Sequence, residues 1–157
     1  MRRLASAFFA LAVLAAPLAA QTHPDFTGKW VLDPKSLDAN MSGISITLNV
    51  KQDSKALTVD SDASTPMGAQ KTSSVFNLDG SASKNTADTP GGSLTLTSTG
   101  TWDGSTFVIA TNGEIQGQAL TQTEHWSLDA DGKTLHLQRD VSAMGQNASF
   151  KMNFNKQ

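Results

Sequence analysis

Alternation of apolar and polar residues along most of the chain is the feature that most limits its fold. One run comprises Ile44, Ile46, Leu48 and Val50, which are separated by single polar residues. A period of two places all four side chains on one face of a β-strand. The last such run comprises Ala148, Phe150, Met152 and Phe154. The pattern predicts a chain built mainly of β-strands.

Short turn-forming pairs stand between these runs. They are Asp53-Ser54, Asp79-Gly80, Asp103-Gly104, Asn112-Gly113 and Asp131-Gly132. Such pairs favour tight turns between adjacent antiparallel strands. We therefore predict an all-β, antiparallel up-and-down meander of about 8–10 strands that closes into a barrel, because an open sheet leaves unpaired edges and an uncovered apolar face. A β-sandwich of two packed sheets is the alternative.

One turn pair gives a specific strand register. With Asp103-Gly104 as a two-residue turn, Trp102 faces Ser105 and Gly100 faces Phe107. The aromatic ring would then lie where the neighbouring strand has no side chain.

Two polar segments interrupt the alternation. Residues 61–68 and 82–92 contain Pro or Gly and few apolar residues. We predict them as loops, either at the mouth of a cavity or as arms on the surface.

The N-terminal residues have the layout of a secretory signal peptide. Arg2 and Arg3 precede an uncharged apolar run over residues 4–18, and small residues follow up to Ala20. The run is shorter than the roughly 20 residues that a membrane span needs. We predict that residues 1–20 are removed and that residues 21–157 form a single exported domain, periplasmic or secreted, with no transmembrane segment.

Charge and composition exclude several classes of function. The formal net charge is −2, which leaves no basic footprint for nucleic acid. The chain has no cysteine, so packing and hydrogen bonds must stabilise it without disulfides. The sequence carries no Gly-x-Ser-x-Gly, His-Glu-x-x-His or phosphate-loop motif, and we predict neither enzymatic activity nor a cofactor.

Two stretches of the sequence resemble known proteins. The first, DFTGKWVLDPKS, contains Gly28-x-Trp30 on an expected first strand, followed by a helical turn with Asp33 as its N-cap and Pro34 at its first position. Together with HWSLDADGKTLHL, it resembles exported bacterial proteins described as lipocalin-like. Gly-x-Trp before a meander is also similar to the calycin superfamily of lipocalins, fatty-acid-binding proteins and avidins. That resemblance implies a barrel in which an arginine from a late strand, Arg139 here, packs on Trp30.

Polar residues interrupt the inward-facing rows of two late strands. Gln122 and Glu124 share a face with Trp126, and Arg139 lies on the apolar face of the next strand. A four-residue loop over residues 129–132 places Gln122 opposite Arg139, whereas a two-residue loop at Asp131-Gly132 places Glu124 there. A polar cluster of this kind either plugs one end of a barrel or anchors the polar head of a ligand. The predicted ligand site comprises Trp30, Trp102, Phe107, Gln122, Glu124, Trp126 and Arg139.

The three histidines are weak candidates for metal binding. If Gln21 becomes the first residue, its amine, two amide nitrogens and the His23 imidazole form a set that suits Cu(II) or Ni(II). His125 and His136 face outward, and the four-residue loop would align them directly opposite each other. The first set depends wholly on cleavage directly before Gln21 and is lost if that Gln cyclises, and two histidines alone make a weak site, so we predict no metal.

These observations favour an exported binding protein that holds a small apolar or amphiphilic ligand in its barrel. The alternative is a ligand-free β-domain that acts through its outer surface as an envelope structural, interaction or inhibitor protein, with a protein partner that the sequence does not identify. The two hypotheses differ in whether the barrel interior is filled.

Overall fold

The computed structural model describes residues 23–38, 41–66, 68–89 and 92–157. The strands of this part of the chain are β1 (Gly28–Leu32), β2 (Ser45–Gln52), β3 (Ala56–Thr65), β4 (Gly68–Asn77), β5 (Ala82–Thr89), β6 (Gly92–Asp103), β7 (Thr106–Ile115), β8 (Gln118–Leu128), β9 (Thr134–Ala143) and β10 (Gln146–Lys156). A short 3-10 helix, η1 (Pro34–Ser36), follows β1. It begins as predicted, with the Asp33 side chain accepting a hydrogen bond from the backbone N–H of Lys35. The predicted signal peptide, residues 1–20, lies outside the described residues.

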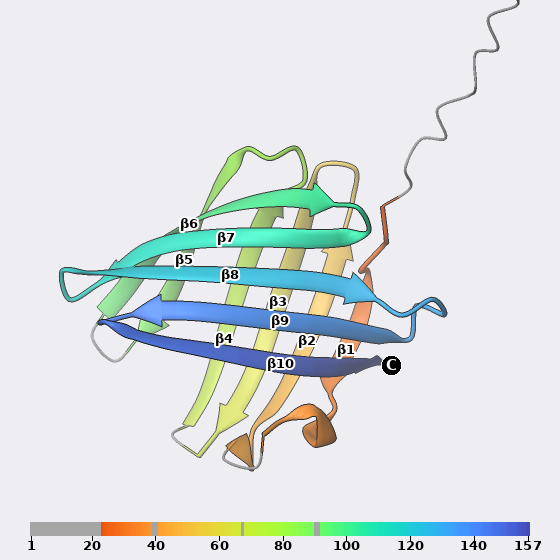
Figure 1. The fold of residues 1–157 in the computed structure, drawn as a ribbon, viewed down its shortest axis with the longest axis horizontal. Coiled ribbons are helices and arrows are strands. Elements are labelled where there is room, and N and C mark those ends of the chain that lie inside the picture. Colours follow the sequence, from red (N-terminus) through yellow and green to blue (C-terminus); the bar gives the residue numbers. More distant parts are fainter. Residues whose placement is uncertain (1–22, 39–40, 67, 90–91) are drawn as a thin grey trace, which may run out of the picture.

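The strands form one antiparallel sheet that curls into a nearly closed barrel. Strands that are consecutive in sequence pair with each other except β4 and β5, and β1 also pairs with β10, which gives the order β4-β3-β2-β1-β10-β9-β8-β7-β6-β5. In Figure 1, β6 to β10 cross the view in front while β1 to β4 run steeply behind them. The predicted all-β, up-and-down barrel is therefore confirmed. Within the described ranges, no helix is long and apolar enough to cross a membrane.

The barrel closes between β4 and β5, the two outermost strands of the sheet, through a side chain. The Asn85 amide accepts a hydrogen bond from the backbone N–H of Val75 (2.8 Å) and donates one to the Val75 carbonyl (3.1 Å). The Asn85 side-chain amide thus makes the pair of hydrogen bonds to β4 that the backbone of a neighbouring strand would otherwise make. A barrel leaves no exposed edge only when its last pair of strands is joined, so this amide completes the seam.

The structure corrects the predicted loops and one predicted turn. Residues 61–65 extend β3 and residues 82–89 form β5, so both segments are largely strand. Asn112-Gly113 lies within β7, and the turn to β8 is formed by Gln116 and Gly117, both with positive φ. Positive φ at both central residues suits the tight turns that join antiparallel strands.

The register between β6 and β7 also differs from the prediction. Trp102 faces Phe107 and Gly100 faces Ile109, because the turn consists of Gly104 and Ser105. The shift is two residues, so every side chain keeps its predicted face. The Phe107 ring still lies over Gly100, where a Cβ atom would come within 2.3 Å of its Cζ.

One end of the barrel is closed by the segment before β1. Gln52 on β2 holds this segment, since its amide accepts from the Phe26 N–H (3.0 Å) and donates to the Pro24 carbonyl (3.0 Å). On the other side of the barrel, Phe26 stacks with Trp102 at 6.0 Å and meets the edge of Trp126 at 5.9 Å. The segment therefore spans the barrel, and Phe26 is fully buried.

Candidate functional site

A cavity of about 250 Å³ lies in the barrel toward the end opposite Phe26. One part of its lining is apolar and includes Leu48, Val59, Phe76, Trp126, Leu137 and Phe154. The other part is polar and includes Asn85, Ser98, Thr111, Gln122, Glu124 and Arg139. An apolar cavity with a few convergent polar groups is typical of a small-molecule site. The volume lies just below the range of about 300–1,000 Å³ for drug-sized ligands, so it suits a small or single-chain molecule.

Glu124 is the centre of the polar part. Its Oε1 atom accepts hydrogen bonds from Arg139 Nε (2.6 Å) and Gln122 Nε2 (2.9 Å), and it forms an ion pair with Arg139 Nη2 (2.6 Å). Its Oε2 atom accepts one from Trp126 Nε1 (2.9 Å). The Glu124 side chain is only 5% exposed, so this carboxylate is buried and satisfied by its neighbours.

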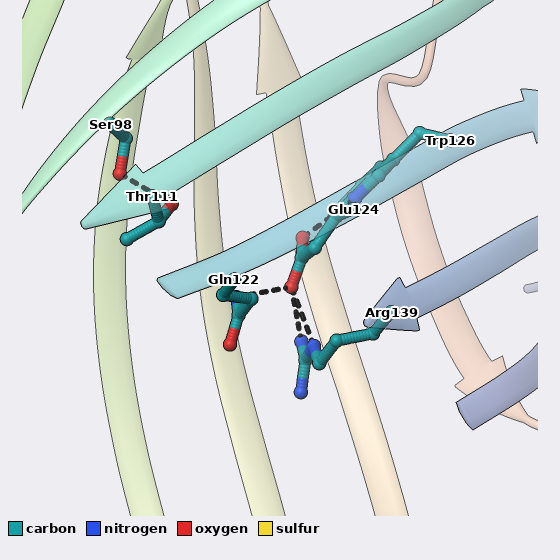
Figure 2. A network of polar contacts seen from close by, with 6 residues as sticks. All are labelled: Ser98, Thr111, Gln122, Glu124, Trp126 and Arg139. Carbon is teal, nitrogen blue, oxygen red and sulfur yellow. Dashed lines mark hydrogen bonds and ion pairs between the residues drawn. The ribbon is translucent and has the colours of Figure 1, made fainter. Parts of the chain in front are cut away.

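The other groups of this network face the cavity. A carboxylate only accepts hydrogen bonds, so Gln122 must turn its NH2 toward Glu124 and its carbonyl oxygen away. Figure 2 shows that oxygen and the free nitrogen of the Arg139 guanidinium pointing to the same side, away from Glu124. The Arg139 side chain is 36% exposed, which places it where the cavity meets solvent.

A second buried polar pair lies on the two strands that precede β8, with Thr111 opposite Gln122 in the ladder. Ser98 on β6 and Thr111 on β7 share a hydrogen bond of 2.8 Å between their hydroxyl groups. Both residues are buried and both line the cavity (Figure 2). The sequence prediction did not include this pair, although their inward positions follow from the period of two that places Ile109 inside.

The structure brings four of the seven predicted site residues to the cavity. These are Gln122, Glu124, Trp126 and Arg139. Glu124 faces Arg139 directly, which is the register predicted for a two-residue loop. The connection itself starts at Asp129, whose N–H donates a hydrogen bond to the Thr134 carbonyl at 3.0 Å.

The other three predicted residues pack at the closed end. Trp30 and Phe107 are fully buried, and Trp102 lies between His23, whose ring stacks on it at 4.1 Å, and Phe107 at 4.8 Å. The segment that carries Phe26 fills the space in front of these rings. Their contacts there stabilise the fold.

The structural role implied for Arg139 belongs to another residue. Arg139 pairs with Glu124, and the cation over the Trp30 ring is Lys156 on β10, with Nζ 5.1 Å from the ring centroid. Trp30 also donates from Nε1 to the Phe26 carbonyl at 2.8 Å. The cation that packs on Trp30 therefore lies on the last strand, β10, which pairs with β1.

The histidines do not form a cluster. His125 faces Gln138 and His136 faces Ser127, so the two are not directly opposite. Instead, His136 contacts Asp129 (2.6 Å) and Asn153 (2.8 Å), which raises the pKa of His136 and lowers that of Asp129. Gln21, on which the His23 hypothesis depends, lies outside the described residues, and those that are described contain no group of three or more ligands for a metal ion.

Solved structures with the same architecture are recognisable despite low sequence identity. Zebrafish ileal bile acid-binding protein, in complex with cholic acid, matches with a TM-score of 0.52 at 14% identity, over 84% of this chain and 98% of that chain. Secretory abundant heat soluble protein 4 from Ramazzottius varieornatus matches with a TM-score of 0.55 at 17% identity, over 88% of this chain and 99% of that one. No model of a known protein family matches the chain, and no curated protein matches it in sequence.

The chain thus shares the fold of these two proteins. Over its described residues it is a ten-strand antiparallel up-and-down barrel, closed at one end by the segment before β1. The resemblance noted in the sequence is confirmed at the level of the fold.

Proposed function

We propose that the protein is an exported carrier that holds a small apolar or amphiphilic molecule in the barrel cavity. The observation that carries the proposal is the cavity of about 250 Å³, with an apolar wall on one side and the Glu124 network on the other. A protein that needed its interior only for stability would gain by filling this space, because unfilled volume costs packing energy.

Two further features support a carrier. The zebrafish protein of the same architecture was solved in complex with cholic acid, which is an amphiphile. The apolar run over residues 4–18 supports export, since it has the composition and length of a signal peptide.

Binding can be tested with an apolar dye and a variant that fills the cavity. Ala63 on β3 lines the cavity, and the next residue, Ser64, is exposed on the outer face. We expect Ala63→Phe to abolish uptake of Nile red by occupying the cavity, while Ser64→Phe, which adds the same ring outside, leaves uptake unchanged. Equal dye binding by both variants would place the dye on the surface and contradict the proposal.

Export and cargo can be tested together by mass spectrometry of protein recovered from the periplasm of a bacterial host. The denatured mass should correspond to a chain that begins at Gln21. A native mass that exceeds it by a discrete increment would identify a bound molecule. The ligand-free alternative instead predicts equal native and denatured masses and no dye uptake.

A further inference from the structure

The charge of the cavity indicates which head group a ligand should carry. Among the described residues that line it, Glu124 and Arg139 alone are charged, and they are bonded to each other. The lining is therefore neutral overall. A charged head group in this cavity would find no counter-ion that is not already paired. Moving an unpaired charge out of water is costly.

The free hydrogen-bonding groups are equally specific. A guanidinium has five N–H donors, and only two of those on Arg139 are used by Glu124, through Nε and Nη2. The Gln122 carbonyl oxygen faces away from Glu124, and none of the described residues donates a hydrogen bond to it. The site thus presents unused donors and an unused acceptor side by side.

We propose that the cavity selects neutral single-chain amphiphiles whose head group both accepts and donates hydrogen bonds, such as a primary amide. The head group's carbonyl accepts from Arg139, its N–H donates to Gln122, and its chain lies against the apolar wall of the cavity. This inference rests on the proposed carrier function and adds the class of ligand.

The two charged alternatives fit less well. A carboxylate would compete with Glu124 for one guanidinium and would face the Gln122 oxygen, which is also an acceptor. An ammonium group would be attracted by that oxygen but would lie next to the Arg139 cation. The selectivity against charged head groups therefore arises because Arg139 is already paired with Glu124.

The test compares octanamide, octanoate and octylamine, which share one chain length and differ in head group. Isothermal titration calorimetry on the full-length protein at neutral pH should give an octanamide affinity at least about tenfold higher than either charged ligand. Octanoate or octylamine binding as tightly as octanamide would overturn the proposal.

A single substitution should reverse the preference. Glu124→Gln keeps an amide oxygen to accept from Trp126 Nε1 but leaves the Arg139 charge without its counter-ion. We expect octanoate to bind this variant about tenfold more tightly than it binds the parent. Lys151→Met, which removes a charge from an exposed position on β10, is the matched control and should change neither affinity.

The double variant Glu124→Gln/Arg139→Met keeps the test decisive if Glu124→Gln folds poorly. It removes both charges and should weaken octanamide binding without improving octanoate binding. Nile red binding distinguishes a wrong ligand class from a wrong carrier function. If dye enters the parent but not Ala63→Phe and the head groups are not discriminated, the ligand class is wrong and the carrier stands. If neither dye nor octyl ligands bind, the carrier function is wrong as well.

Discussion

Replacing Arg139 with methionine would leave the Glu124 carboxylate buried without its counter-charge. Methionine retains the apolar stem that lies along the barrel wall but removes the Nε hydrogen bond and the Nη2 ion-pair contact to Oε1. Only the bonds from Gln122 and Trp126 would remain. The variant therefore isolates the cost of an unpaired anion inside the barrel.

The expected cost follows from the exposure of the two partners. Breaking a buried ion pair by removing one member costs about 3–5 kcal/mol. The Glu124 side chain is 5% exposed but that of Arg139 is 36% exposed, so water reaches the pair from one side. We therefore expect Arg139→Met to reduce the free energy of unfolding by about 2–3 kcal/mol. Glu124→Gln leaves the charge on the more exposed partner and should cost about 1 kcal/mol.

Urea unfolding followed by circular dichroism measures these differences. With a denaturant slope of about 2 kcal/mol per molar, the midpoint of Arg139→Met should fall by about 1 M. The double variant Glu124→Gln/Arg139→Met should be more stable than Arg139→Met alone, because neither charge is then unpaired. Lys71→Met is the control, since its pair with Asp62 is exposed and should contribute less than about 1 kcal/mol. A loss for Arg139→Met no larger than that for Glu124→Gln would refute the reasoning.

Three other perturbations test separate parts of the fold. Gly100→Ala should destabilise the protein by about 1–3 kcal/mol, because the new Cβ would lie 2.3 Å from Cζ of the buried Phe107 ring, and an unchanged urea midpoint would contradict this packing. Asp129→Asn should lower the pKa of His136, measured by NMR titration. The stability difference from the parent should be largest near pH 5, where the imidazole is protonated and the carboxylate ionised, and should shrink as pH rises through the His136 pKa, so a difference that grows above pH 7 would be contrary. Asn85→Ala should speed amide hydrogen exchange along β4 at the seam, where unaltered protection would show that the Asn85 amide does not hold the strands together.

The period of two predicted the fold and the faces of the strands but not their registers. A turn pair such as Asp103-Gly104 marks where the chain reverses, yet it does not say which two residues form the turn. The turn uses Gly104 and Ser105, which moves the pairing by two residues. A shift of two preserves the side of the sheet on which each residue lies, so the inward rows were predicted correctly.

The strand β5 escaped prediction because its physical support is not an apolar face. Its sequence, ASKNTADT, has no alternation to detect, and its inward residue Asn85 bonds the backbone of β4 instead of packing in the core. Pairing with β6 along its length holds this strand in place. Non-local pairing of this kind has no signature in a short window of sequence.

In the candidate site, too, contacts between neighbouring strands could be predicted and contacts between distant segments could not. The polar cluster of Gln122, Glu124 and Arg139 could be predicted because all three lie on inward faces of strands that are adjacent in sequence. The placement of Trp102 and Phe107 could not, since it depends on Phe26, which reaches them from a segment more than seventy residues away in the sequence. Which end of a barrel is plugged is decided by such a contact.

The contrast between the two ends of the barrel indicates how the chain reconciles stability with an unfilled interior. At the closed end, Phe26, Trp30 and Phe107 are fully buried, and burial of each aromatic side chain contributes on the order of 2–3 kcal/mol. At the other end, Glu124 and Arg139 occupy inward positions where packed apolar side chains would be at least as stabilising. A chain selected for stability alone would have no reason to keep a buried ion pair beside unfilled volume. Its position, with donors and an acceptor turned toward the cavity, is accounted for if the pair serves a ligand.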